Sequence, residues 1–149
     1  DAARIDGMLD FIRSFADRGH HLKEEDLLFA RMAERGFPVD SGPLGVMRHE
    51  HEVGRGHVRA IAEAAPRAAA GQASGVKVVA DNLAGWADLL RAHIYKEDNV
   101  LYPMARHALT AADLDDLEAG FARVEGEAVG EGVAGRYRAF VRDLLKQLG

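Results

Sequence analysis

Two segments of the sequence repeat the same pair of metal-binding residue types at the same spacing. His20 precedes Glu24 by four positions, and His93 precedes Glu97 by four. Residues four apart in an α-helix lie one turn apart on the same face, so each imidazole and its carboxylate would point in one direction. Imidazole nitrogens suit iron, and carboxylate oxygens complete its shell in many non-heme sites. The spacing therefore predicts two halves of a metal site, carried by two helices.

A third histidine, His51, lies in a separate segment that is also expected to be helical. On a helical wheel it falls in the middle of that segment's apolar stripe. His20 and His93 lie beside the apolar stripes of their own helices, and the two glutamates follow one turn later. Three helices therefore each direct a histidine toward a shared interior, and two of them add a carboxylate. We predict a metal site made of His20, Glu24, His51, His93 and Glu97.

The remaining histidines are not expected to bind metal. His21 and Glu25 point toward the margin of their helix on the wheel, so the pair that starts one position earlier is the one facing the core. His49 lies on the solvated side of its helix, and His57 and His107 are border or surface residues. We expect that replacing His21 or His49 by Ala leaves the metal content unchanged.

Two interpretations without metal compete with this prediction. A single histidine on an apolar face is more often a hydrogen-bonded core residue, and a single His–Glu pair is often a contact on a helix surface. However, an ionised carboxylate in an apolar interior is costly unless a partner compensates it. Two glutamates and three imidazoles on converging faces therefore favour a bound cation.

The composition limits the other chemistry. The chain has 149 residues, no cysteine and a net charge of −5. Without thiolates, a metal must be held by His, Asp or Glu. Lys and Arg are scattered, which disfavours nucleic acid, and no apolar run approaches the roughly 18 residues of a membrane span. We expect a soluble, cytoplasmic protein. The sequence begins at Asp1, not at methionine, which is compatible with a natural start upstream.

Helix breakers divide the chain into long helical segments. Three bundle helices are predicted at about 3–35, 41–66 and 74–108. Gly36 is the expected C-terminal cap of the first, and Ser41 is the expected N-cap of the second. Such long segments joined by short turns are typical of an antiparallel bundle.

The rest of the chain, about 111–148, is predicted to be a helical extension. Thr110 and Asp113 form an expected capping box that opens a short helix to about residue 125. A last amphipathic helix should pack against the bundle through residues at helical spacing: Tyr137, Phe140, Val141, Leu144, Leu145 and Leu148.

The predicted fold is therefore all-α: an antiparallel, up-and-down helical bundle with an extra C-terminal amphipathic helix, in a single domain covering 1–149. Ferritin-like di-iron bundles are the alternative architecture. Their signature is Glu-x-x-His, which differs from the His-x-x-x-Glu spacing of this chain.

Three motifs in this order resemble those of bacterial hemerythrin-like (HHE cation-binding) proteins. They are HHLKEEDLLF at 20–29, GPLGVM running to EHE at 42–52, and HIYKEDNVLYP at 93–103. The resemblance covers most of the chain as far as His107, and more loosely the tail to Leu148. It implies a hemerythrin-like bundle with two non-heme iron ions.

The resemblance also assigns the ligands. The family's His-x-x-x-Glu ligands fall on His20 with Glu24 and on His93 with Glu97, and its lone histidine falls on His51. The two glutamates would bridge the irons. Zinc or manganese could occupy the same ligands.

The sequence departs from the family pattern at two points. The family bundle starts with one more helix, whose histidine is a further iron ligand, whereas this sequence begins where the family's second helix begins. A segment outside this sequence, another chain in a homo-oligomer, or the last helix must then cover the gap, and the last helix has no histidine. Tyr102 stands where Phe is common. We favour a packing residue with its hydroxyl at the surface over a hydrogen bond to the site.

The function implied is binding or sensing of a small ligand, O2, NO or peroxide, at a di-iron centre. Two alternatives remain: a di-iron redox enzyme acting on NO or peroxide or in iron–sulfur repair, and a metal-free helical interaction module.

Overall fold

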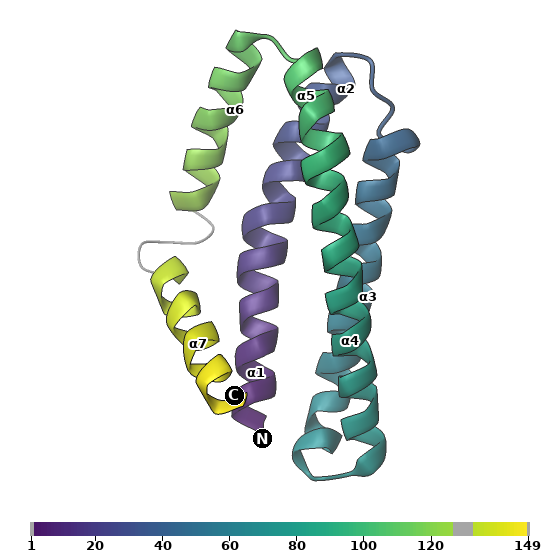
Figure 1. Ribbon diagram of the computed structural model, residues 1–149, viewed down its shortest axis with the longest axis vertical. Coiled ribbons are helices and arrows are strands. Elements are labelled where there is room, and N and C mark those ends of the chain that lie inside the picture. Colours follow the sequence, from purple (N-terminus) through teal and green to yellow (C-terminus); the bar gives the residue numbers. More distant parts are fainter. Residues whose placement is uncertain (1, 127–132, 149) are drawn as a thin grey trace.

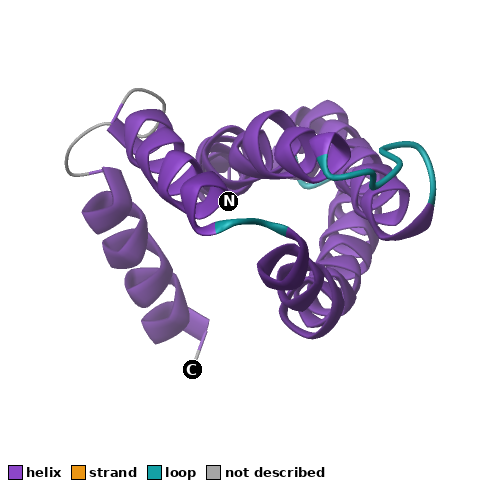
Figure 2. Cartoon of the chain, turned by 90° about the horizontal axis from the view of Figure 1, so that it is seen from above, coloured by secondary structure: helices purple, strands orange, loops and turns teal. Residues whose placement is uncertain are grey.

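The computed structural model describes residues 2–126 and 133–148, and every element in these two stretches is a helix. Three long helical runs lie side by side and antiparallel, and two shorter helices lie along the outer side of the first run (Figure 1). The view from above shows helices joined by loops, and no strand among the described residues (Figure 2). The all-α bundle that the sequence predicts is confirmed.

The first run consists of α1 (Ala2–Phe11), the π-helices η1 (Ile12–His21) and η2 (Lys23–Leu28), and α2 (Phe29–Glu34). Gly36 follows it with φ of 91°, the left-handed conformation that ends helices and favours glycine. The predicted cap is therefore confirmed.

The second run is α3 (Gly42–Ala69). Ser41 is its N-cap with an extended backbone, but the serine side chain makes no capping hydrogen bond. The helix passes Pro66 and ends at Ala69, three residues later than predicted. Proline removes one backbone donor, and the last turn is still anchored by buried Ala68.

The third run consists of α4 (Ala73–Lys96), the π-helix η3 (Glu97–Leu101) and α5 (Tyr102–Ala108). Helix α6 (Ala111–Val124) begins with the predicted capping box, which is confirmed: Thr110 accepts from the backbone of Asp113 and the Asp113 carboxylate accepts from the backbone of Thr110. Helix α7 is Val133–Leu148.

Helices α6 and α7 pack against different parts of the first run. Asp113 of α6 accepts hydrogen bonds from Arg31 and Arg35. In α7, Tyr137 is buried, and its ring meets that of Phe11 edge-on at 5.5 Å. The C-terminal helices therefore extend the bundle along its first run.

The core has two apolar clusters separated by a polar layer. One cluster contains Phe29, Met32, Leu44, Met47 and Leu101, toward the α2 end. The other cluster lies toward the α1 end: Ile5, Leu9, Ile12, Val58, Ile61, Ala64, Ala68 and Val79. Along all three runs, the histidines and glutamates singled out above lie between the residues of these two clusters.

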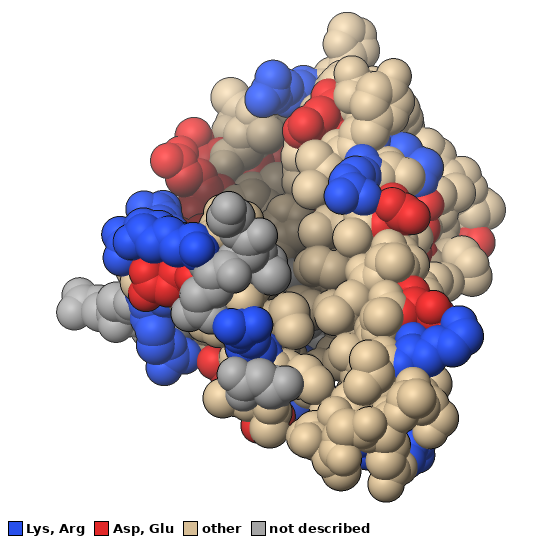
Figure 3. Space-filling view, turned by 60° about the horizontal axis from the view of Figure 1, so that its bottom comes forward, with Lys and Arg blue, Asp and Glu red and all other residues tan. Residues whose placement is uncertain are grey.

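The two remaining expectations from the sequence concern membrane-span character and surface charge. None of the helices in the described stretches combines the length and apolar character that a membrane span needs. On the face seen in Figure 3, blue and red side chains are intermixed around a central hollow, without a field of one sign.

Candidate metal centre

Four ionisable side chains lie buried in the polar layer at the middle of the bundle. Glu24, His51, His93 and Glu97 are each between 1% and 4% exposed. They come from all three long runs: η2, α3, the end of α4 and η3. Their ligand atoms lie within 4.8 Å of one another, close enough to surround a metal ion.

The distances within the group are those of converging donors. His51 Nε2 lies 3.1 Å from His93 Nε2 and 3.2 Å from Glu24 Oε2. His93 Nε2 lies 2.9 Å from Glu97 Oε1. His20 Nε2 joins from the side, 3.3 Å from Glu97 Oε1 and 3.7 Å from Glu24 Oε1. The structure thus brings all five sequence-predicted site residues together.

Two further carboxylates hold the outer nitrogens of the buried imidazoles. His51 Nδ1 lies 2.7 Å from Glu25 Oε1, and His93 Nδ1 lies 2.9 Å from Glu50 Oε2. A carboxylate accepts, so it favours the tautomer with the proton on Nδ1. Both Nε2 atoms then carry lone pairs that face each other. A carboxylate behind each histidine is the common arrangement around metal-bound imidazoles.

Glu25 and Glu50 are themselves fixed by basic residues. Arg55 donates to Glu25 at 2.8 Å, and Lys96 donates to Glu50. Burial raises the pKa of Glu25, but hydrogen bonds from His51 and Arg55 outweigh it and lower the pKa overall. The same balance lowers the pKa of Glu50, through Lys96 and His93. Both outer carboxylates are therefore held in the ionised, accepting form.

The buried donors fit a cation better than they fit one another. Glu24 Oε2 is buried and receives no hydrogen bond from the described residues. Buried polar atoms are normally satisfied, and an unpartnered carboxylate oxygen beside two facing lone pairs is costly. A positive ion between these atoms would remove both penalties. The residues present therefore fit a metal ion.

Without such an ion, the cluster attracts protons. Burial lowers the pKa of His93, but hydrogen bonds to Glu97 and Glu50 raise it overall. The hydrogen bond to Glu97 raises the pKa of His20. Burial raises the pKa of Glu97, but both histidines lower it well below its usual range. Metal binding must therefore compete with protons for these imidazoles.

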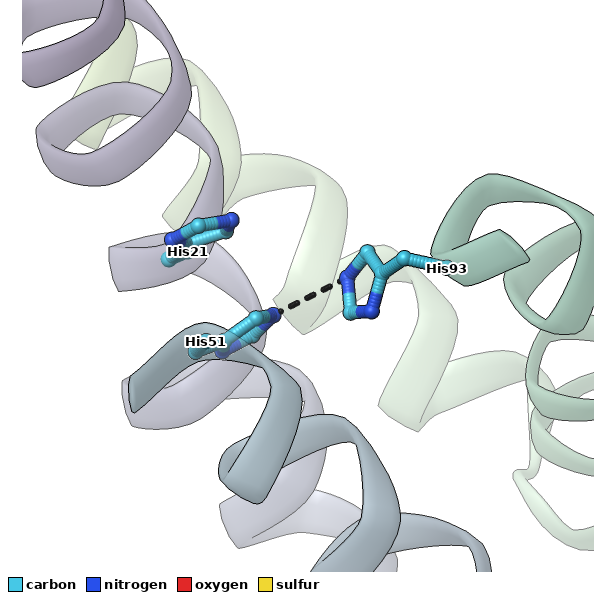
Figure 4. A group of neighbouring side chains, drawn as sticks. All are labelled: His21, His51 and His93. Atoms are coloured by element: carbon cyan, nitrogen blue, oxygen red, sulfur yellow. Dashed lines mark hydrogen bonds between the residues drawn. The ribbon is translucent and has the colours of Figure 1, made fainter. Parts of the chain in front are cut away.

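The prediction that His21 lies at the margin of its helix is wrong. Its ring stacks on that of His51, with centroids 3.8 Å apart and planes 17° apart (Figure 4). Wheel placement assumes α-helical winding, whereas this part of the first run is π-helical, with each amide bonded one residue further back. The slower rotation per residue turns both His20 and His21 inward, and it also brings Glu25 onto His51.

The other histidines lie as the sequence predicts. His49 and His107 are exposed, and half-buried His57 pairs through Nδ1 with the Asn82 side chain at 2.9 Å. They contribute nothing to the buried group. Glu50, whose carboxylate contacts His93, was not predicted as a site residue, although it directly precedes His51 in the sequence.

Tyr102 differs from the favoured sequence interpretation. Its hydroxyl is not at the surface but donates to Glu24 Oε1 at 2.9 Å. Burial and the negative charge of Glu24 raise the pKa of this phenol far above its usual range, so it stays protonated. The tyrosine therefore holds one oxygen of Glu24 and leaves Oε2 directed at His51.

A pocket of about 580 Å³ opens on the side of the group where His20 lies. His20, Glu24 and Tyr102 are among its lining residues, and the His20 side chain is 42% exposed. Helix α6 forms the opposite wall with Leu117 and Phe121. Helix α6 thus covers part of the gap between the first and third runs and leaves an opening to the site.

Comparison with known proteins places these observations in a family. The chain is 26% identical over 148 residues to the uncharacterized proteins Mb2018 of Mycobacterium bovis and Rv1995 of Mycobacterium tuberculosis. These alignments cover 99% of this chain and 57% of each relative, so the chain spans little more than half of their length. No solved structure matches the chain significantly.

The family model gives the more informative assignment. The model of the hemerythrin HHE cation-binding domain matches residues 1–105, which include all three long helical runs as far as α5. The chain therefore belongs to the hemerythrin HHE family of metal-binding helical proteins.

Proposed function

We propose that this chain holds two iron ions through His20, Glu24, His51, His93 and Glu97 and binds O2, NO or peroxide beside them. The observation that carries the proposal is the pair of Nε2 atoms facing each other at 3.1 Å, on two rings oriented by outer carboxylates. With the buried glutamates they form a mixed nitrogen and oxygen donor set that suits iron, with zinc or manganese as substitutes.

The proposed bridging role of the two glutamates draws on their position among the three histidines. Glu24 lies between His20 and His51, at 3.7 and 3.2 Å. Glu97 lies between His20 and His93, at 3.3 and 2.9 Å. Each carboxylate therefore has an imidazole on either side, as a bridging glutamate would.

The pocket at His20 is the proposed approach for the small ligand. Bound iron would supply redox chemistry and coordination positions left open by the protein. The chain itself supplies the half-exposed His20 ring and Tyr102, whose protonated hydroxyl donates to Glu24, in the lining of this pocket. Its volume of about 580 Å³ leaves ample room for a molecule of two atoms.

A further helix is proposed to complete the centre in the assembled protein. The five residues include three imidazoles, and the sequence from Ala111 to Leu148 contains no histidine. A helix from a second copy or from a longer form of the protein would add a further nitrogen donor. Metal content measured against oligomeric state, by light scattering of each chromatographic fraction, tests this.

The first experiment is elemental analysis of metal per chain, with optical spectra before and after adding azide or O2. We expect close to two irons and a near-ultraviolet band of a bridged di-iron centre. His93→Ala and Glu97→Ala should lose most of the iron, whereas exposed His49→Ala should keep it.

Three results would contradict parts of this proposal. One iron or none would leave a helical interaction module as the better account. Iron loss in His49→Ala with retention in His51→Ala would overturn the site. Catalytic consumption of peroxide or NO, in place of a stable ligand complex, would make the centre an enzyme.

A further inference from the structure

A second cavity lies on the α3 side of the first run, away from the pocket at His20. Its volume is about 170 Å³, and it lies between η1, α3 and α4. A single water needs about 10–15 Å³, so there is room for a small molecule. None of the five predicted metal ligands lines this cavity, although His21, whose ligand atom lies within 4.8 Å of those of His51 and His93, does.

The charged side chains among the described residues that line the cavity are basic. Arg13, Arg55 and Arg59 line it, together with His21, and none of the described lining residues is acidic. Arg55 is neutralised by Glu25 and Glu52, at 2.8 and 2.7 Å. Within the described residues, Arg13 and Arg59 have neither an ion pair nor a hydrogen bond through their side chains. Two exposed arginines without an ion pair among the described residues therefore line a half-enclosed space in a chain whose net charge is −5.

The rest of the lining is apolar. Ile12 and Val58 contribute aliphatic surface, and Trp86 contributes an indole wall. Guanidinium groups bind carboxylates with two parallel hydrogen bonds, and apolar walls favour a hydrocarbon chain over water. A compact inorganic anion would use the arginines but leave these walls in contact with water.

The cavity is adjacent to the metal centre through shared side chains. His21, which lines it, stacks on His51 at 3.8 Å. A much smaller void of about 20 Å³ shares His21, Gly54 and Trp86 with the cavity and reaches His51 and His93. This void is the size of a single water. An anion in the cavity would therefore lie one imidazole away from the proposed iron ligands.

We propose that this cavity is a binding site for a short-chain organic carboxylate, held by Arg13 and Arg59 over the apolar wall of Ile12, Val58 and Trp86. The site is separate from the pocket proposed for the diatomic ligand or peroxide. Carboxylate binding can therefore be tested independently of iron binding.

Trp86 makes the proposal directly measurable, because it is the chain's one tryptophan and lines the cavity. The full chain as purified is titrated with sodium butyrate, with sodium chloride holding the ionic strength constant, and the indole emission is recorded. We expect a saturable change, and tighter binding of butyrate than of acetate because the longer chain covers more apolar surface. Circular dichroism of each variant checks that it is folded.

Arg13→Gln and Arg59→Gln should each weaken butyrate binding about tenfold, because each removes a charge-assisted hydrogen bond. Arg91→Gln is the matched control: Arg91 is exposed, pairs with Asp88 and does not line the cavity. It should bind as the unmodified chain does. A linear, non-saturating response, or equal affinity in the Arg13 and Arg59 variants, would overturn the site. Saturable binding of phosphate but not of carboxylates would overturn the assignment of the ligand.

Discussion

The imidazole of His51 contacts three aromatic rings and the carboxylate of Glu25. His21 covers one face at 3.8 Å, and Phe29 lies nearly parallel to the ring at 6.1 Å. The His93 ring meets it at 4.9 Å with planes 61° apart, and Glu25 holds Nδ1. Such packing fixes the direction of Nε2 before any ion binds, which reduces the ordering that metal binding must impose.

The outer carboxylates give the most specific test at this scale. Glu25→Gln and Glu50→Gln remove the negative charge that favours the Nδ1–H tautomer of the neighbouring histidine, while the shape of the side chain is kept. We expect iron affinity to fall about 10–100-fold in each variant. Competition with a chelator, followed by optical spectroscopy, measures this.

Glu63→Gln is the matched control, because Glu63 is exposed on the same helix as Glu50. It should retain unmodified affinity. If Glu25→Gln and Glu50→Gln bind iron as the control does, the outer carboxylates do not orient the ligands.

At the scale of elements, π-helical winding coincides with the site. Residues His20 and His21 end η1, Glu24 lies in η2, and Glu97 begins η3. A π turn holds one extra residue and is frequent at functional sites. Here it allows two consecutive histidines, and both Glu24 and Glu25, to contact the buried group.

Periodicity and motif spacing could predict which helices meet and which five residues converge. The apolar stripes that bring the helices together lie in the α-helical segments on either side of the site. They could not predict the roles of His21 and Glu25, since a wheel with constant rotation has no π turn. Nothing in the local sequence marks such a turn, because tertiary packing decides it. The capping box at Thr110 was readable from sequence because both of its hydrogen bonds are local.

The α3–α4 hairpin allows a test based on glycine. A Cβ on Gly75 would lie 2.6 Å from the backbone nitrogen of Ala68 and 2.7 Å from the carbonyl carbon of Arg67. Alanine is the better helix former, yet this contact is with backbone, which cannot move aside. We expect Gly75→Ala to lower the free energy of unfolding by about 1–3 kcal/mol in urea denaturation.

For Gly56→Ala, in the neighbouring helix, we expect the opposite effect on stability. A Cβ on residue 56 would lie near only Arg59 Nη2, at 3.8 Å. This variant should be stabilised by up to about 1 kcal/mol, because alanine loses less conformational freedom. If both variants change stability in the same direction, close packing of the hairpin at Gly75 is not the cause.

For the molecule as a whole, Asp113 joins α6 to the first run. Hydrogen bonds from the backbone and side chain of Thr110, and then from Arg35, lower its pKa to about 2 from an ordinary value of 3.8. Because the pKa of Asp113 is lower in the folded state than in the unfolded state, the carboxylate contributes fully to stability above about pH 4. This contribution is lost as the pH falls through about 2.

The stability difference between the unmodified chain and Asp113→Asn should therefore be constant above about pH 4 and shrink below it. Urea denaturation of metal-free protein between pH 6 and pH 2.5 measures this difference. Asp115→Asn, at an exposed position on the same helix, is the control. If this difference in unfolding free energy does not change with pH, the ion pairs of Asp113 do not stabilise the docking of α6.

Metal removal should destabilise the whole bundle, because the buried donors would lose the ion that compensates them. A metal ion present at 100 times its dissociation constant raises the free energy of unfolding by about 2.7 kcal/mol. For a chain of this size, that corresponds to a rise in melting temperature of about 5–10 °C. Calorimetry with and without a chelator should show this shift, and His93→Ala should melt at the same temperature in both. Equal melting temperatures for the unmodified chain would contradict coupling of metal binding to folding.

The hairpin and the Asp113 contacts also differ in how far apart their partners lie along the chain. Helices α3 and α4 are neighbours in sequence and form the most extensive packing in the described structure, whereas Asp113 meets Arg35 across 78 residues. Short loops close first, so His51, His93 and Glu97 should be assembled early, and the first run should complete the site later. Gly75→Ala would then mainly slow folding, and Asp113→Asn would mainly speed unfolding.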